Sequence, residues 1–340
     1  GCTVSAQVTL TIEICNSLAC ETANHVINDY SEVTDIDSNY QTIAVADPHL
    51  FAPGDQVFLI QMQGAVINNE NNESYGTIVD LGNTGRHEFA VVKEVTPLTL
   101  QLTTPLRYRD YDINGHVQVI RVPEYDHITI DTMLTCMPWN GKTGGVLVLD
   151  ANCVMMNANI DVTGKGFRGA RYTNEPGSVS REHSNEFVSA SSFYWAPKGE
   201  GIAGNGFPPF LYGKGSPANG EGGGPKHTAG GGGGANYGAG VIGGYGYQGV
   251  LGNIRMPQGY GGKTLASYYS GQDKRLFMGG GGGSGHVNHE HGSHGANGGG
   301  IVVIRANTLR NPQQYAIIAR GDDAPADTSY VNPDGCGGGG

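Results

Sequence analysis

Several features that define common protein classes are scarce in this sequence of 340 residues. Charged residues form 15% of the chain, and 31 acidic against 20 basic residues give a net charge of −11. No basic stripe is present, so nucleic acid is a poor candidate partner. No apolar run approaches the roughly 18 residues of a membrane-spanning helix, and the first residues, GCTVSAQ, lack the apolar core of a signal peptide. We therefore expect no nucleic-acid partner and no direct membrane span.

Helical patterns are nearly absent, whereas alternating and β-branched stretches recur at short intervals. The stretches typical of strands are 7–14, 40–47, 55–64, 88–95, 98–106 and 115–125. Their turn-punctuated spacing predicts an antiparallel β-barrel or sandwich over residues 21–135. Residues 1–20 are expected to be separate, either the tail of a preceding immunoglobulin-like module or a linker strand.

An internal repeat is the most informative feature of the rest of the chain. GGVLVLDANCVMMN (144–157) and GGIVVIRANTLRN (299–311) both begin with two glycines and reach Ala-Asn at the same offset. Each copy is followed by a short strand closed by glycine, NIDVTGKG at 159–166 and AIIARGDD at 316–323. Repeated strands without helices indicate stacked coils, so we predict a β-helix-like scaffold over residues 136–340. The whole chain is thus expected to be all-β.

Glycine is abundant, with 57 residues, and most of it forms an insertion at about 164–298 between the two repeat copies. Ordering backbone costs about 1–2 kcal/mol per residue, and glycine loses the most freedom. Bundled polyglycine II helices, extended with three residues per turn, could supply lateral hydrogen bonds in return. The alternative is irregular loops wrapped over the scaffold, in which a side chain at Gly232 would be tolerated. The structural glycines predicted here are Gly144, Gly145, Gly232, Gly281, Gly299 and Gly300.

The sequence ends with DGCGGGG, so it stops inside a glycine block. This ending predicts that the scaffold is truncated and that the sequence is a fragment.

Several segments together resemble a known family. They are INDYSEVTDID, FAPGDQVFLIQMQGAVI, GGVLVLDANCVMMNANIDVTGKGFRGA, GGGGGSGHVNHEHGSHGANGGGIVVIRA and DGCGGGG. Over about residues 26–340 the chain resembles glycine-rich ectodomains of large surface proteins that gliding bacteria export through the type IX secretion system. Residues 144–170 and 279–306 are the most specific part of this likeness. The gliding-motility-associated sorting domain that often ends such proteins is absent from this sequence.

The resemblance implies an exported, extracellular protein of the cell surface that is adhesive or forms filaments. It implies the type IX secretion machinery as a partner, and it brings no catalytic residues.

Six cysteines without C-x2-C spacing argue against zinc and favour a disulfide-permissive compartment. Cys136 and Cys153, which flank a turn-rich segment, are the first candidate pair, and Cys15 and Cys20 are the second. In the family, both Cys136 and Cys153 stand where other residues are usual, and two departures together favour a bond. The alternative is six unpaired thiols.

The stretch GHVNHEHGSH holds His286, His289, His291 and His294. Four histidines within nine residues could bind zinc, nickel or copper. The alternative is a polar, exposed tip of the glycine-rich insertion.

Two further motifs are weak. GKGFRG (164–169) and GYGYQG (244–249) match the dinucleotide-binding pattern, but no helix pattern follows the first, and such matches are expected by chance in a glycine-rich chain. Asp35, Asp37 and Ser38 hint at calcium without the complete loop that calcium sites use. We therefore expect no cofactor, with calcium or zinc as the alternatives.

Aromatic residues of the insertion are the candidate ligand-binding residues, because exposed aromatic rings stack on sugars and favour interfaces. They are Tyr194, Trp195, Tyr237, Tyr245 and Tyr247. For the stretch that contains Tyr194 and Trp195, the alternative is a small local core.

Carboxylates in the same region offer a weaker pattern. Glu182, Glu186 and Glu200 are the nearest cluster for polysaccharide hydrolysis, and the alternative is solvated loop acids.

The sequence as a whole predicts a non-enzymatic, extracellular structural or adhesive module that binds surface glycans or proteins of host or neighbouring cells, or self-associates into filaments. The first alternative is a polysaccharide-active enzyme on a β-helix. The second is a secreted client captured with its export machinery.

Overall fold

The computed structural model describes most of the chain and is almost entirely β. The described residues are 21–22, 25–173, 185–188, 195–204, 211–225, 228–246, 258–270, 274–287, 291–325 and 337–340. The predicted strand at 7–14 and five candidate residues, Cys15, Cys20, Tyr194, Tyr247 and His289, lie outside these ranges. The helices within them are the short α1 (Ala266–Tyr269) and the 3-10 turns η1 (Pro48–Leu50) and η2 (Ile113–Gly115). The predicted all-β class is confirmed.

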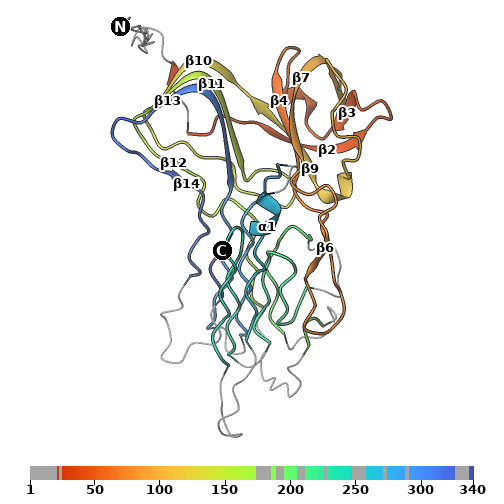
Figure 1. Cartoon of the computed structure of the whole chain (residues 1–340), viewed down its shortest axis with the longest axis vertical. Helices are drawn as coiled ribbons and strands as arrows, with labels where there is room; N and C mark the ends of the chain where they lie inside the picture. The colour runs from red at the N-terminus through yellow and green to blue at the C-terminus, as the bar shows by residue number, and fades with distance from the viewer. Residues whose placement is uncertain are drawn as a thin grey trace, which may run out of the picture.

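Six antiparallel strands form a sheet that closes on itself (Figure 1). In order around it they are β2 (Tyr30–Ile36), β3 (Thr42–Val45), β8 (Thr99–Leu102), β7 (His87–Val95), β4 (Gln56–Gln61) and β9 (Val117–Val122), which pairs back with β2. Alternate residues such as Val33, Val57 and Val119 are buried together inside it. A short hairpin of β5 (Val66–Ile67) and β6 (Ile78–Asp80) lies between β4 and β7 in the chain. We call the six strands the closed sheet.

Four parallel strands form a second sheet, in which the sequence repeat is visible as strand pairing. In order they are β1 (Glu21–Thr22), β10 (Glu124–Ile130), β11 (Val146–Met156) and β13 (Ile301–Arg310). The two repeat copies pair in register, with Val146 opposite Ile301 and Ala151 opposite Ala306. The following strands, β12 (Ile160–Asp161) and β14 (Ile317–Ile318), also pair in parallel. The offset read from the sequence therefore matches the register of the sheet.

One strand changes partner relative to the sequence prediction. The residues of β10, which we grouped with the barrel or sandwich over residues 21–135, pair in parallel with β11. Side chains continue this pairing, because Asn152 Nδ2 donates to Asp126 Oδ1 at 3.2 Å and Asn307 Nδ2 donates to Asn152 Oδ1 at 2.8 Å. Alternation predicts a strand but does not state which strand it pairs with.

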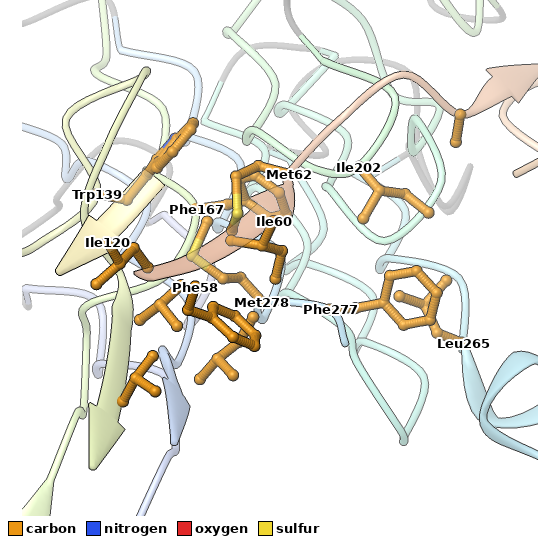
Figure 2. Close-up of a cluster of buried hydrophobic side chains, with 14 of the residues drawn as sticks. Phe58, Ile60, Met62, Ile120, Trp139, Phe167, Ile202, Leu265, Phe277 and Met278 are labelled. Atoms are coloured by element: carbon orange, nitrogen blue, oxygen red, sulfur yellow. The ribbon is translucent and has the colours of Figure 1, made fainter. Parts of the chain in front are cut away.

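One hydrophobic cluster joins the two sheets to the glycine-rich part (Figure 2). Phe58 and Ile60 of β4 point away from the interior of the closed sheet into this cluster, because neighbouring strand residues face opposite ways. Trp139 and Phe167 belong to the same cluster. Their rings contact each other edge to face, with centroids 6.0 Å apart. Met278 brings the glycine-rich part into the same cluster. We call these residues and their buried neighbours the junction cluster.

Below the two sheets, extended segments run side by side without strand assignment (Figure 1). They come from the insertion between β12 and β13 and from the last residues of the chain. We call them the glycine-rich bundle, whose described segments are 164–173, 195–204, 211–225, 228–236, 238–246, 258–265, 279–287, 291–300 and 337–340. Within the described part of the chain, no helix has the length and apolar character needed to cross a bilayer.

Candidate functional site

Backbone hydrogen bonds between segments hold the glycine-rich bundle together. Residues 279–286, the central segment, show a regular order of partners. The N–H groups of Gly279 and Gly282 donate to segment 291–300. Those of Gly280, Gly283 and His286 donate to segment 228–236, and those of Gly281 and Ser284 donate to segment 195–204. The neighbouring segment to which a backbone N–H donates therefore recurs every three residues.

The central segment is surrounded. It exchanges backbone hydrogen bonds with six other segments, namely 164–173, 195–204, 211–225, 228–236, 291–300 and 337–340. Each bond satisfies polar backbone groups that burial would otherwise leave unpaired. Lateral bonding thus replaces the side-chain core that glycine cannot supply.

Close backbone approach explains why glycine is needed at the predicted structural positions. A side chain at Gly232 would overlap the backbone of Tyr260 and Gly261, and one at Gly281 would overlap that of Arg168. A side chain at Gly299 would overlap the backbone of Ala319.

At the two glycines that begin the first repeat copy, the backbone conformation is a further reason why glycine is required. Gly144 and Gly145 have φ angles of +95° and +75°, a backbone region that other residues rarely adopt. At Gly300 an added Cβ would lie 2.8 Å from the carbonyl oxygen of Gly145, which is too close for real atoms.

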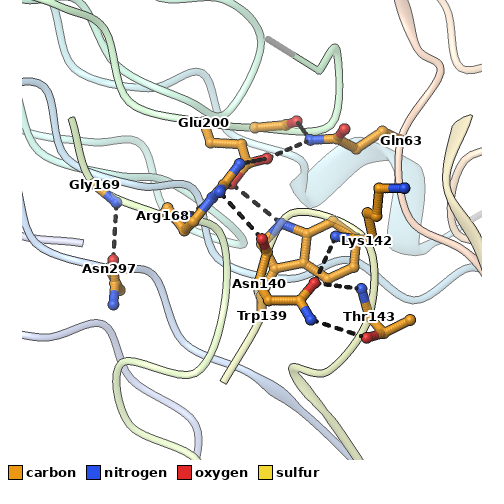
Figure 3. A network of polar contacts seen from close by, with 10 residues as sticks. Gln63, Trp139, Asn140, Lys142, Thr143, Arg168, Gly169, Glu200 and Asn297 are labelled. Carbon is orange, nitrogen blue, oxygen red and sulfur yellow. Dashed lines mark hydrogen bonds and ion pairs between the residues drawn. The ribbon is translucent and has the colours of Figure 1, made fainter. Parts of the chain in front are cut away.

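A buried carboxylate fastens the bundle to both sheets (Figure 3). Glu200 accepts hydrogen bonds from Trp139 Nε1 at 3.1 Å and from Arg168 Nε at 3.0 Å. Gln63 Nε2, from the loop after β4, donates to the other Glu200 oxygen at 3.3 Å. Because three regions of the chain meet on one side chain, Glu200 fixes how the bundle sits on the sheets.

Asn219 and Glu221 are polar side chains that lie fully buried inside the bundle. Asn219 crosslinks three segments: its Nδ2 donates to the carbonyls of Ala235 and Met278, and its Oδ1 accepts from Ile202 N–H at 2.9 Å. Glu221 Oε2 accepts from Gly283 N–H at 2.8 Å, while its Oε1 has no hydrogen-bond partner among the described residues. Burial raises the pKa of Glu221 well above its usual range.

The outer edge of the bundle exposes a group of apolar side chains. Tyr237, Val241, Ile242 and Tyr245 have 72%, 77%, 56% and 49% of their surface exposed. They come from one stretch of chain that also contains open glycines, since a Cβ at Gly238 would meet nothing within 4 Å. We call these four side chains the apolar rim.

The candidate ligand-binding aromatics are divided between this rim and the interior. Tyr237 and Tyr245 belong to the rim. Trp195 is buried, so it is not an exposed sugar-stacking residue. Sequence cannot separate these cases, because an aromatic ring suits both a core and an exposed contact surface.

The histidine group is not assembled as a metal site in the described part of the chain, where no three His, Cys, Asp or Glu residues gather as ligands. His286 is buried, and its backbone N–H donates to the carbonyl of Ala229 within the bundle. His294 stacks on Tyr172 with ring centroids 4.6 Å apart and accepts the N–H of that residue. Burial, together with Arg171, lowers the pKa of His294. His291 is partly buried on the same stretch.

The first candidate disulfide is absent, because Cys136 and Cys153 are both free and buried. Cys136 packs in the cluster between the parallel strands, together with Val154 and Met156. Cys153 is a buried residue of β11 that does not belong to this cluster. Burial raises the pKa of the Cys136 thiol to about 12.

The remaining motifs serve local structure. Asp37 Oδ1 accepts the N–H groups of Gln41 and Thr42, which closes a turn and lowers the Asp37 pKa. The 164–169 motif lies in the bundle, where Gly166 bonds to Gly298 and no helix begins.

The carboxylate group is likewise dispersed. Glu186 is buried and pairs with Lys214 Nζ at 3.2 Å, and Lys198 Nζ donates to the Glu186 carbonyl. Glu182 lies outside the described residues.

No family model, curated protein or solved structure matches this chain. The likeness to exported surface proteins therefore remains a prediction.

Sequence reasoning missed several residues of the bundle. Asn219 and Glu221 look like loop residues in the sequence, and Val241 and Ile242 look like core residues. The available signal was the spacing of glycines around them, because a polar or apolar residue inside a glycine run stands out.

Proposed function

We propose that this chain is a non-enzymatic structural and adhesive module of the extracellular cell surface. The observation that carries the proposal is the three-residue repeat of donor directions in the central segment. Polyglycine II has this repeat, with three residues per turn and a rise of about 3.1 Å per residue. Such a bundle is thin and stiff and leaves few side chains to attack, which suits an exposed surface structure.

The architecture fits a display function. We interpret the closed sheet as a small β-barrel and the parallel strands as a β-helix-like scaffold that pins both ends of the bundle. Glu200 and the junction cluster support this interpretation, because they join the two sheets to the bundle. The bundle then projects away from both sheets (Figure 1).

The apolar rim supports an adhesive function. Exposed apolar groups clustered on one stretch mark interaction surfaces, and tyrosine suits sugars and protein partners alike. The partners that we propose are surface glycans or proteins of host or neighbouring cells. The family resemblance supports export through the type IX machinery and a place on the cell surface.

The described carboxylates support a non-enzymatic function. Glu200 is engaged by Arg168 and Trp139, and Glu186 is engaged by Lys214, so each has a structural task.

The test is an array of glycans, surface polymers and cell-surface proteins, probed with the full chain and with Tyr237→Ala and Tyr245→Ala variants. Leu98→Ala, at an exposed apolar residue in the turn between β7 and β8, is the control. Binding that the rim variants lose and the control keeps supports adhesion. Silence across the array would contradict adhesion, and release of sugar ends would contradict the non-enzymatic assignment.

A further inference from the structure

Segment 228–236, which we call the groove segment, lacks one neighbour. It exchanges backbone hydrogen bonds with five segments, namely 211–225, 238–246, 258–265, the central segment and 337–340. The central segment has six such neighbours. On the sixth side of the groove segment, between 238–246 and 337–340, lies a groove of about 480 Å³. Its lining is mostly glycine, from 230–231, 233–234, 243–244 and 337–340, together with Thr228, Val241 and Ile242.

The backbone carbonyls of the groove segment also show that one neighbour is missing. The carbonyls of Ala229, Gly232 and Ala235 accept from the central segment, and those of Gly230 and Gly233 accept from 258–265. The third set in this three-residue order, Gly231 and Gly234, accepts no hydrogen bond from any described residue. Two carbonyls at the spacing of one turn therefore face the side where the groove lies.

The neighbouring segment 238–246, the edge segment, carries the complementary groups. It bonds to the groove segment and to 258–265, whereas the N–H groups of Val241, Ile242 and Gly244 donate to no described residue. The face that it turns to its neighbours consists of Gly240 and Gly243, where a side chain would overlap backbone. It also carries three of the four residues of the apolar rim.

We propose that the groove receives the edge segment of a second copy of this chain, an inference that rests on the lateral packing proposed above. The edge segment borders the groove, so a two-fold axis parallel to the segments places each edge segment in the groove of the other copy. Free N–H groups of one copy then face free carbonyls of the other. The exposed side chains of Val241 and Ile242, which line the groove, become covered, which favours association. The product is a closed dimer through the bundle edges.

The experiment is sedimentation velocity over a concentration series with the full chain. Val241→Glu places a charge on the edge segment, and Val79→Glu in β6 is its matched control, because these valines are 77% and 69% exposed. Gly339→Trp places a bulky side chain on a residue that lines the groove, where an added Cβ has only Asp322 O nearby, at 3.5 Å. We expect dimers for the wild type and Val79→Glu, and monomers for Val241→Glu and Gly339→Trp.

Three outcomes would overturn the inference: a monomeric wild type, dimers that persist in both variants, or a monomer that binds a lysine-flanked oligoglycine peptide in the groove instead. The array described above is run on the same variants. Failure of dimerisation with intact surface binding removes this inference alone, whereas a silent array with intact dimers removes adhesion alone.

Discussion

Gly232 and Gly238 belong to the same glycine-rich stretch but have different surroundings. A side chain at Gly232 would overlap the backbone of Tyr260 and Gly261, whereas one at Gly238 would meet nothing within 4 Å. Backbone cannot move aside as the end of a flexible side chain can. The cost of replacing a glycine in this bundle therefore depends on its position between segments.

We predict that Gly232→Val destabilises the protein by more than about 4 kcal/mol or prevents folding of the bundle, because the overlap is with backbone. Gly238→Val should change the free energy of unfolding by about 0.5 kcal/mol or less. Thermal melting of both variants measures the difference. Equal melting temperatures for the two would show that the bundle is not tightly packed.

Ionisation of the buried Glu221 destabilises the folded bundle. Its pKa is raised in the folded state, so the folded protein keeps the proton where the unfolded chain has lost it. Stability is therefore greatest below the ordinary carboxyl pKa of 4.5 and declines as the pH rises toward the folded-state pKa.

We predict that Glu221→Gln removes this part of the pH dependence. The variant should resemble the wild type in acid and become the more stable of the two as the pH rises toward neutrality. Melting temperatures across this pH range give the difference, with Glu94→Gln, an exposed glutamate of β7, as control. A difference in melting temperature between the variant and the wild type that does not change with pH would contradict the raised pKa of Glu221.

At the scale of elements, Glu200 determines how segments are joined. Arg168, Trp139 and Gln63 all donate to it (Figure 3). Trp139 Nε1 is buried at this site, so loss of the carboxylate would leave a buried donor without its acceptor.

We predict that Glu200→Ala destabilises the chain by about 2–4 kcal/mol, since it leaves buried donors unpaired. Amide hydrogen exchange should accelerate in the bundle more than in the closed sheet, because the bundle loses its attachment. Glu94→Ala is the control and should exchange like the wild type. Uniform acceleration throughout the chain would indicate general destabilisation instead.

At the scale of the whole molecule, the junction cluster makes the two sheets and the bundle depend on one another. Phe58, Val148, Phe167 and Met278 come from the closed sheet, the parallel sheet and the bundle, yet are buried together (Figure 2). A shared core of this kind favours one cooperative unfolding transition.

We predict that Phe167→Ala lowers stability by about 3–5 kcal/mol through lost burial and a cavity, with the whole chain still melting in one transition. Scanning calorimetry measures both quantities, and Leu98→Ala on the surface provides the comparison. Separate transitions for bundle and sheets would show that the cluster does not couple them.

The sequence by itself determined the strands and the main pairing. Alternation marked the strands of the closed sheet, since one side of each is buried. The offset of the repeat placed Ala151 opposite Ala306, because the two repeat copies pair in parallel from equivalent positions. Glycine content marked the region where side chains do not form the core.

Only the tertiary structure decided which residues are buried and which face outward in the glycine-rich region. Trp195 is internal and Tyr237 exposed, although both are aromatic residues of the same glycine-rich insertion. Cys136 and Cys153 are both buried without a bond between them, which spacing alone did not show. The vacancy beside Gly231 and Gly234 depends on how segments distant in sequence surround one another. The physical reason is that a glycine run carries no side-chain pattern, so its neighbours are fixed by lateral backbone hydrogen bonds between distant segments.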